Sequence, residues 1–174
     1  EWIGIYHDQK DYAVCFGVEP EIWQKAEDNQ YVPETSLTET EIRMPGGHLT
    51  IAQLIALLNT IPMEITFVDV DNINRFFNEG PKDFKRPGMA IDREVFSCHP
   101  PKIEATVRRI IGEFRAGALD EVPIWMDKNG KCMLVRYMAV RDKEGKYLGT
   151  LELVQDMGFA KEHFQPEKRQ EEIW

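Results

Sequence analysis

Apolar residues recur at helical spacing in two stretches of the chain, and the first begins after residue 50. Its apolar positions, which share one side of a helix, are Ile51, Leu54, Ile55, Leu57 and Leu58. Thr50 is the predicted N-cap, and Gln53 three positions later completes a capping box. Pro62 cannot continue a helix and restricts the residue before it, so we expect the helix to end there.

The second helical stretch follows the motif SCHPPK at residues 97–102. Its periodic apolar positions are Ile103, Val107, Ile110, Ile111 and Phe114. Pro100 and Pro101 suit the first helical turn, where no amide donor is needed, and Gly117 suits the C-terminal cap. The basic side chains of this helix are interpreted as a solvated face, which is ordinary on an amphipathic helix.

Short apolar runs bounded by turn residues predict five strands. The first two lie around Ile65–Phe67 and Ile73–Phe77, and the turn residues Asp69–Asn72 join them into an antiparallel hairpin. The last three are EVPIWMD, CMLVRYMAV and YLGTLELVQD, with the strong hairpin signal Asn129-Gly130 after the first of them. CMLVRYMAV is apolar on both faces, so we expect it to be central and covered on both sides.

This order of elements predicts an α+β fold, in which helices cover one face of an antiparallel five-stranded sheet. Such an arrangement leaves an apolar pocket between sheet and helices, a common place for a small ligand. Residues 1–47 are interpreted as a lead-in or linker with one or two short strands, because prolines and glycines interrupt them. Residues 161–174 form a charged C-terminal tail.

Composition narrows the classes of function. The length of 174 residues suits one domain. The net charge of −9 disfavours binding to nucleic acid or to an anionic membrane. No apolar run approaches the roughly 18 residues of a membrane span. Three scattered cysteines argue against a disulfide scaffold and for a reducing, cytoplasmic location. The abrupt start at Glu1 suggests an excised fragment.

Motifs of catalysis are absent from the sequence. It contains no Gly-x-Ser-x-Gly elbow, no phosphate loop of the Walker type and no dinucleotide fingerprint. No CxxC pair is present, so a structural zinc site is not expected. We therefore predict a protein that is not an enzyme and holds no metal through such a motif.

The segments ITFVDVDNINRFFNEG and DKNGKCMLVRYMAVRDKEGKYLGTLELVQDM resemble a PAS domain, and the resemblance covers roughly residues 48–160. In the second segment it rests on Gly145, Gly149 and the pair Gln155-Asp156. The resemblance implies a sensory or regulatory module that binds a small molecule or cofactor between sheet and helices. The alternative is a dimerisation or docking module whose interior is fully packed and holds no ligand.

A narrower resemblance rests on LTIAQLIALLNTIPMEITFVD together with CHPPK and YMAVRDKEGKYLGTLELVQD. These stretches are similar to one PAS subgroup that closes bacterial and archaeal proteins. In that subgroup an uncharacterised helical domain and a hemerythrin-type bundle precede the PAS module. The resemblance therefore implies an upstream hemerythrin-type domain, to which this module would relay its state. Met63-Glu64 before the first strand and methionine-rich strands depart from the subgroup.

Two sets of residues are proposed as contacts. The residues expected at the ligand pocket are Phe67, Phe77, Phe96, Cys98, His99, Ile103, Val107, Trp125 and Tyr137. The apolar face of the first helix is wider than one sheet edge needs, and PAS-like modules commonly self-associate through such flanking helices. We therefore expect a homodimer, the commonest symmetric assembly, through Leu54, Ile55 and Leu58.

Three interpretations of SCHPPK remain open. His99 bonds a local carbonyl while Cys98 fills an apolar gap, or His99 is an axial ligand to haem, as in some PAS domains. In the third, Cys98 is a redox-sensitive thiol at a helix N-terminus. His99 precedes a proline, so its backbone should be extended, and we expect both residues at the rim of the pocket.

Overall fold

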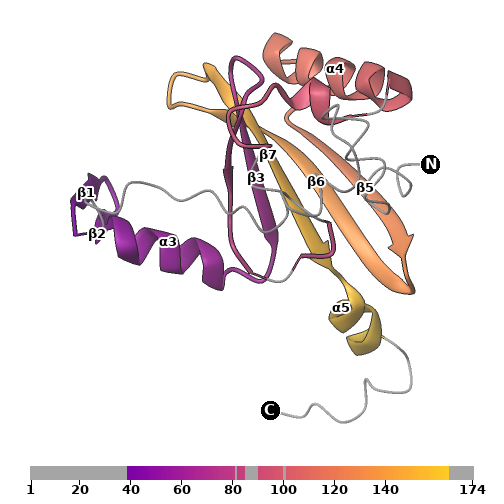
Figure 1. Cartoon of the computed structure of the whole chain (residues 1–174), viewed down its shortest axis with the longest axis horizontal. Helices are drawn as coiled ribbons and strands as arrows, with labels where there is room; N and C mark the ends of the chain where they lie inside the picture. Colours follow the sequence, from indigo (N-terminus) through magenta and orange to yellow (C-terminus); the bar gives the residue numbers. More distant parts are fainter. Residues whose placement is uncertain (1–38, 81, 85–89, 100, 165–174) are drawn as a thin grey trace, which may run out of the picture.

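One antiparallel sheet organises the molecule. A computed structural model describes residues 39–80, 82–84, 90–99 and 101–164. The sheet has five strands, in the order β4-β3-β7-β6-β5 (Figure 1). Their bounds are β3 (Glu64–Asp69), β4 (Asn74–Phe77), β5 (Glu121–Lys128), β6 (Lys131–Arg141) and β7 (Tyr147–Asp156). The predicted α+β fold with a five-stranded antiparallel sheet and helices is confirmed.

Helices flank and cover the sheet. They are α3 (Ile51–Thr60), the short 3-10 helix η4 (Val95–Cys98), α4 (Pro101–Ala116) and α5 (Gly158–His163). The capping box of α3 forms as predicted, because the Gln53 N–H donates to Thr50 Oγ1 at 3.1 Å and the Thr50 N–H donates to Gln53 Oε1 at 2.9 Å. No helix in the described part of the chain is long and apolar enough to cross a membrane.

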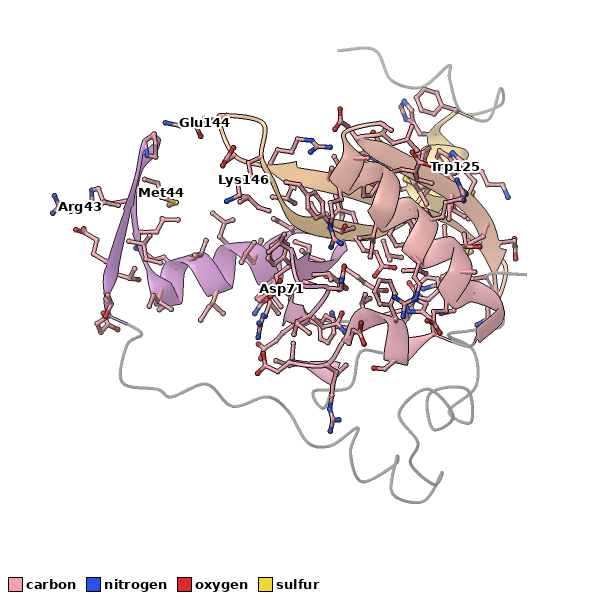
Figure 2. All side chains as sticks on the ribbon, turned by 90° about the horizontal axis from the view of Figure 1, so that it is seen from above. Arg43, Met44, Asp71, Trp125, Glu144 and Lys146 are labelled. Atoms are coloured by element: carbon pink, nitrogen blue, oxygen red, sulfur yellow. The ribbon has the colours of Figure 1, made fainter. Side chains whose placement is uncertain are left out.

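A small hairpin precedes α3 and crosses the predicted boundary between the lead-in and the domain at residue 47. It consists of β1 (Glu41–Met44) and β2 (Gly47–Thr50), which pair antiparallel around Pro45-Gly46. The hairpin lies beyond the edge of the large sheet (Figure 1), and Figure 2 shows Met44 of β1 there. The rest of the predicted lead-in, residues 1–38, and the tail residues 165–174 lie outside the described residues.

Turn chemistry sets the register of the hairpins. Asn129 and Gly130 have φ values of 53° and 80°, as a two-residue turn with two left-handed residues requires, and they bring Lys128 opposite Lys131. Asn72 has φ 66° in the predicted turn between β3 and β4. Both predicted hairpins are therefore confirmed.

The core lies between α4 and one face of the sheet, which we call the inner face. α4 begins at Pro101, and Gly117 follows its last residue with φ 75°. Ile110 and Phe114 of α4 pack in one buried cluster with residues of the middle strands and of the chain before η4: Phe84, Met133, Val135, Tyr137, Tyr147 and Val154. A second cluster joins α4 to β3 and η4 and contains Val68, Val95, Phe96, Val107 and Ile111.

β6 lies between β5 and β7, as expected for its continuous apolar pattern. Its inward side chains Met133, Val135 and Tyr137 are buried. The alternate side chains Leu134, Arg136 and Met138 are only half-buried. The expected cover on both sides is therefore incomplete on the outward face of the sheet.

Candidate functional site

Three polar side chains lie in one row across the inner face. Thr66 on β3 pairs with Glu152 on β7, and Glu152 pairs with Tyr137 on β6. Paired residues point to the same face of a sheet with Cβ atoms about 5 Å apart. Only 4% of Thr66, 9% of Glu152 and 9% of Tyr137 is exposed to solvent. We call these three residues the inner row.

The inner row has apolar neighbours. Val135 and Val154 form the adjacent pair on β6 and β7, and Tyr137 belongs to the same buried cluster as Ile110 and Phe114 of α4. A hydroxyl both donates and accepts hydrogen bonds, and an ionised carboxylate accepts them. In apolar surroundings such bonds are stronger than in water. The inner row can therefore recognise the N–H or O–H groups of a molecule whose body contacts the apolar neighbours.

Glu64 lies on the same face, two residues before Thr66, and binds the backbone of the segment that carries Phe84. Glu64 Oε1 accepts hydrogen bonds from the N–H groups of Asp83 at 2.5 Å and Phe84 at 3.2 Å. Lys128 Nζ donates to the Asp83 carbonyl and lies 3.5 Å from the centroid of the Phe84 ring. These buried charged groups thus hold Phe84, which is 1% exposed, in the core.

Two exposed ion pairs lie away from the inner row. Lys131 Nζ is 2.6 Å from Asp83 Oδ1, and this hydrogen bond raises the pKa of Lys131. Arg136 Nε is 2.6 Å from Glu121 Oε1, and their hydrogen bond lowers the pKa of Glu121 and raises that of Arg136. Exposed pairs of this kind contribute little to stability, so we assign them no part in the site.

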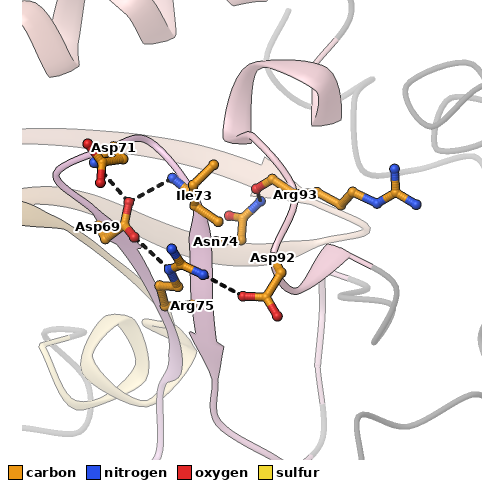
Figure 3. A network of polar contacts seen from close by, with 7 residues as sticks. All are labelled: Asp69, Asp71, Ile73, Asn74, Arg75, Asp92 and Arg93. Atoms are coloured by element: carbon orange, nitrogen blue, oxygen red, sulfur yellow. Dashed lines mark hydrogen bonds and ion pairs between the residues drawn. The ribbon is translucent and has the colours of Figure 1, made fainter.

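A polar network ties the β3–β4 turn to the residues before η4 (Figure 3). Asp69 Oδ1 accepts from the N–H groups of Asp71 at 2.9 Å and Ile73 at 3.0 Å, and Asp69 Oδ2 accepts from Arg75 Nε at 2.5 Å. Arg75 Nη1 donates to Asp92 Oδ1 at 2.6 Å. Partial burial opposes ionisation of Asp69, but these hydrogen bonds, with that of Ile73 the largest, outweigh it and lower the pKa of Asp69. Hydrogen bonds to Asp69 and Asp92 raise the pKa of Arg75.

Comparison with known proteins assigns the family. A sequence profile described as PAS domain matches residues 54–158, more than half of the chain. The chain belongs to the PAS domain family. The crystal structure of the C-terminal domain of a Streptococcus mutans protein is 37% identical to it with a TM-score of 0.69, and the match covers 72% of this chain and 98% of that one.

Other PAS-like structures are more distant in sequence. A sensory box sensor histidine kinase from Vibrio cholerae is 12% identical with a TM-score of 0.42, over 61% of this chain and 90% of that one. The Vibrio cholerae VqmA dimer is 20% identical with a TM-score of 0.46, over 63% of this chain and 52% of that one. No functionally curated protein matches the chain.

His99 of this PAS domain makes a local hydrogen bond. Its backbone is extended, with φ −123° and ψ 137°, as predicted for a residue before proline. Its Nδ1 lies 2.8 Å from the Val95 carbonyl oxygen, which can only accept, so Nδ1 carries the proton in this bond. This geometry supports the interpretation in which the motif stabilises the junction between η4 and α4. The side chain of Cys98 lies outside the described residues, so the thiol interpretation stays a prediction.

The residues beside His99 do not fit a haem. Val95 and Phe96, which precede the motif, are buried and pack against Val107 and Ile111 of α4. On the rest of the inner face Phe84, Phe114 and Met133 are at most 1% exposed, so side chains already fill the layer that a planar macrocycle would need. Among the described residues, no group of three or more His, Cys, Asp or Glu side chains could hold a metal ion.

The residues predicted to line the pocket divide between the two faces. Tyr137 lies in the inner row, and Phe77 pairs with Thr66 and shares its face. Phe96 and Val107 belong to the second core cluster, under α4, and Ile103 is partly buried against it.

Two of these predictions are wrong. Phe67 alternates with Thr66 and Val68 along β3, so it lies on the outward face, where it pairs with Leu151. Trp125 alternates with Ile124 and Met126, which pack on the core, and 61% of it is exposed. A strand places neighbouring residues on opposite faces, so neither side chain reaches the inner face.

Thr66 and Glu152 were not predicted from the sequence as site residues. Both stand within apolar runs, ITFV and LELV, and a single polar residue inside such a run is the signal that would have found them. In a strand that alternates, however, the natural assumption is that a lone glutamate faces solvent and that the leucines face the core.

Proposed function

We propose that this PAS domain is a non-catalytic sensory module that binds a small molecule at the inner row. The observation that supports it is the burial of three hydrogen-bonding side chains, Thr66, Tyr137 and Glu152, in the face that α4 covers. Their chemistry suits a small, mostly apolar molecule with at least one N–H or O–H group from which Glu152 can accept a hydrogen bond.

The test is a screen for thermal stabilisation with matched pairs of small molecules that differ by one N–H or O–H group. A ligand at 100 times its dissociation constant stabilises the folded state by about 2.7 kcal/mol, which raises the melting temperature by roughly 5–10 °C. We expect Glu152→Gln, which keeps the side chain's size, to weaken the preferred ligand about tenfold or more. The control is Glu144→Gln, in the exposed turn between β6 and β7 (Figure 2). Equal binding by the parent and Glu152→Gln would contradict the proposal.

A second candidate function is self-association, which would make the chain a dimerisation module. None of the ten residues of α3 is buried, although most of them are apolar. Ile55 is 37% and Leu57 49% exposed, and Leu54 and Leu58 are half-buried. We propose that a second copy of the chain covers this face, because a matching apolar face is what a symmetric dimer offers.

The haem interpretation can be tested directly on purified protein. We expect titration with haem to give no stoichiometric change in absorption, because Phe84, Phe114 and Met133 occupy the space that a macrocycle would need and His99 bonds Val95. A stoichiometric change that His99→Ala abolishes, and Cys98→Ala does not, would overturn this expectation.

The signal would pass to a domain upstream of the module or to another protein. A hemerythrin-type bundle ahead of the PAS domain is the resemblance-based prediction for that domain. Sequencing of the gene that encodes the chain would test it, by showing whether a helical bundle of this type is encoded ahead of these residues.

A further inference from the structure

α3 is attached to the sheet at one end. Among the described residues, every hydrogen bond between α3 and residues 64–164 involves Leu58 or Asn59, near the C-terminal end of the helix. The helix runs from there to the β1–β2 hairpin beyond the sheet (Figures 1 and 2). No α3 residue is fully buried, and only a few, such as Leu54 and Leu58, are half-buried, so these polar bonds are a large part of what places the helix on the domain.

Asn78, just after β4, makes the buried part of this attachment. It is 3% exposed, and its Nδ2 donates to the carbonyls of Leu58 at 3.2 Å and Met63 at 2.8 Å. Its Oδ1 accepts from the N–H of Ile65 on β3 at 2.8 Å. Only an amide side chain combines two such donors with an acceptor, so one residue binds the helix, the connection after it and the sheet.

Glu79 adds a second tie at the same place. Its N–H donates to Asn59 Oδ1 at 2.9 Å, and Asn59 Nδ2 donates to Glu79 Oε2 at 3.1 Å. This tie is exposed, whereas Asn78 is buried, and a buried amide that loses its partners costs more free energy. Asn78 is therefore the stronger of the two ties.

The same asparagine is connected to the inner face. Lys82 Nζ donates to the Asn78 carbonyl at 2.5 Å and lies 3.3 Å from Asn78 Oδ1. The next two residues, Asp83 and Phe84, are bound through their N–H groups to Glu64 on the inner face. A molecule at the inner row that displaces Phe84 would therefore move the chain that carries Lys82 and so strain the bonds of Asn78.

We infer that Asn78 is a positioning residue that couples the packing of Phe84 on the inner face to the placement of α3. This inference rests on the proposed sensory function and names the element that carries its output. Since α3 also bears the apolar face proposed for self-association, the coupling would let the inner face control contact with a second copy.

Hydrogen–deuterium exchange of the whole chain tests the attachment. Asn78→Asp keeps the size and the Oδ1 acceptor but loses both donors, so we expect α3 amides to exchange at least several-fold faster relative to those of β6. The matched control is Asn74→Asp, since Asn74 is also buried but its amide group donates to the Arg93 carbonyl. Unchanged α3 exchange in Asn78→Asp, or an equal effect of Asn74→Asp, would overturn the inference. If Asn78→Asp does not fold, Asn78→Ser takes its place in the same measurement.

A double-mutant cycle tests the coupling. Phe84→Leu should speed α3 exchange in the parent and add nothing further in the Asn78→Asp background. Additive effects would refute the coupling. The cycle needs no ligand. A ligand screen that finds no binding, together with a non-additive cycle, would reject the sensory function alone. Binding of a ligand, together with an additive cycle, would reject only this inference.

Discussion

Among the described glycines, Gly149 has the least room for a side chain. An added Cβ would lie 2.2 Å from the Val68 carbonyl oxygen and 2.8 Å from the Phe67 ring. The carbonyl belongs to the paired strand β3 and cannot move without breaking the sheet. We expect Gly149→Ala to lower the free energy of unfolding by about 1–3 kcal/mol, measured by urea denaturation.

The control for that substitution is Gly112→Ala in the middle of α4. Nothing lies within 4 Å of a Cβ added there. Alanine is a better helix former, so this variant should gain roughly 0.5–1 kcal/mol. A parent-like urea midpoint for Gly149→Ala would show that the strands separate more easily than the structure implies.

Asp69 makes the stability of the β3–β4 turn dependent on pH. Its pKa is lowered in the folded state, so its contribution is complete above the unfolded pKa near 4 and is lost as the pH falls through the folded value. Asp69→Asn should therefore be less stable than the parent by about 1–3 kcal/mol at pH 7, with the difference shrinking below about pH 4. Urea denaturation at a series of pH values measures it.

Asp92→Asn is the matched control, because Asp92 also bonds Arg75 but 62% of its side chain is exposed. We expect it to change stability by less than about 0.5 kcal/mol at either pH. A difference between Asp69→Asn and the parent that persisted unchanged at acid pH would assign the effect to packing and not to charge.

At the scale of elements, α3 depends on its own cap because no α3 residue is buried. Thr50→Ala removes the acceptor for the Gln53 N–H and should destabilise the helix by about 1 kcal/mol. Exchange of α3 amides should rise while the global urea midpoint stays the same. Thr60→Ala is the control, since Thr60 Oγ1 donates to the Ala56 carbonyl of the same helix and caps no helix end. Equal exchange in the parent and Thr50→Ala would show that other contacts hold α3.

At the scale of the whole molecule, the proposed dimer can be separated from a general effect of surface charge. Ile55→Glu places a charge on α3, whereas Leu119→Glu places one on a similarly exposed residue after α4. We expect sedimentation to show a dimer for the parent and Leu119→Glu. The dissociation constant of Ile55→Glu should rise about tenfold or more, because 1.4 kcal/mol of lost contact suffices. A parent that stays monomeric at high concentration would exclude the dimer.

The sequence by itself determined the features that depend on atoms a few residues apart. The Thr50 capping box, the Asn129-Gly130 turn, the extended backbone at His99 and the glycine after α4 were all predictable. Each follows from local hydrogen bonds or from backbone sterics, which the neighbouring side chains already specify. The order in which the five strands pair came only with the structure.

Only the tertiary structure decided which face of each strand is covered. Alternation in YLGTLELVQD separates Leu151 and Leu153 from Glu152, but it does not say which set meets α4. Pairing with Tyr137 and Thr66 turns Glu152 inward and leaves the leucines with Phe67 on the outward face. Likewise, Asn78 binds Leu58, 20 residues earlier in the chain. Contacts between distant segments exist only after the chain has folded, so no local pattern could have specified them.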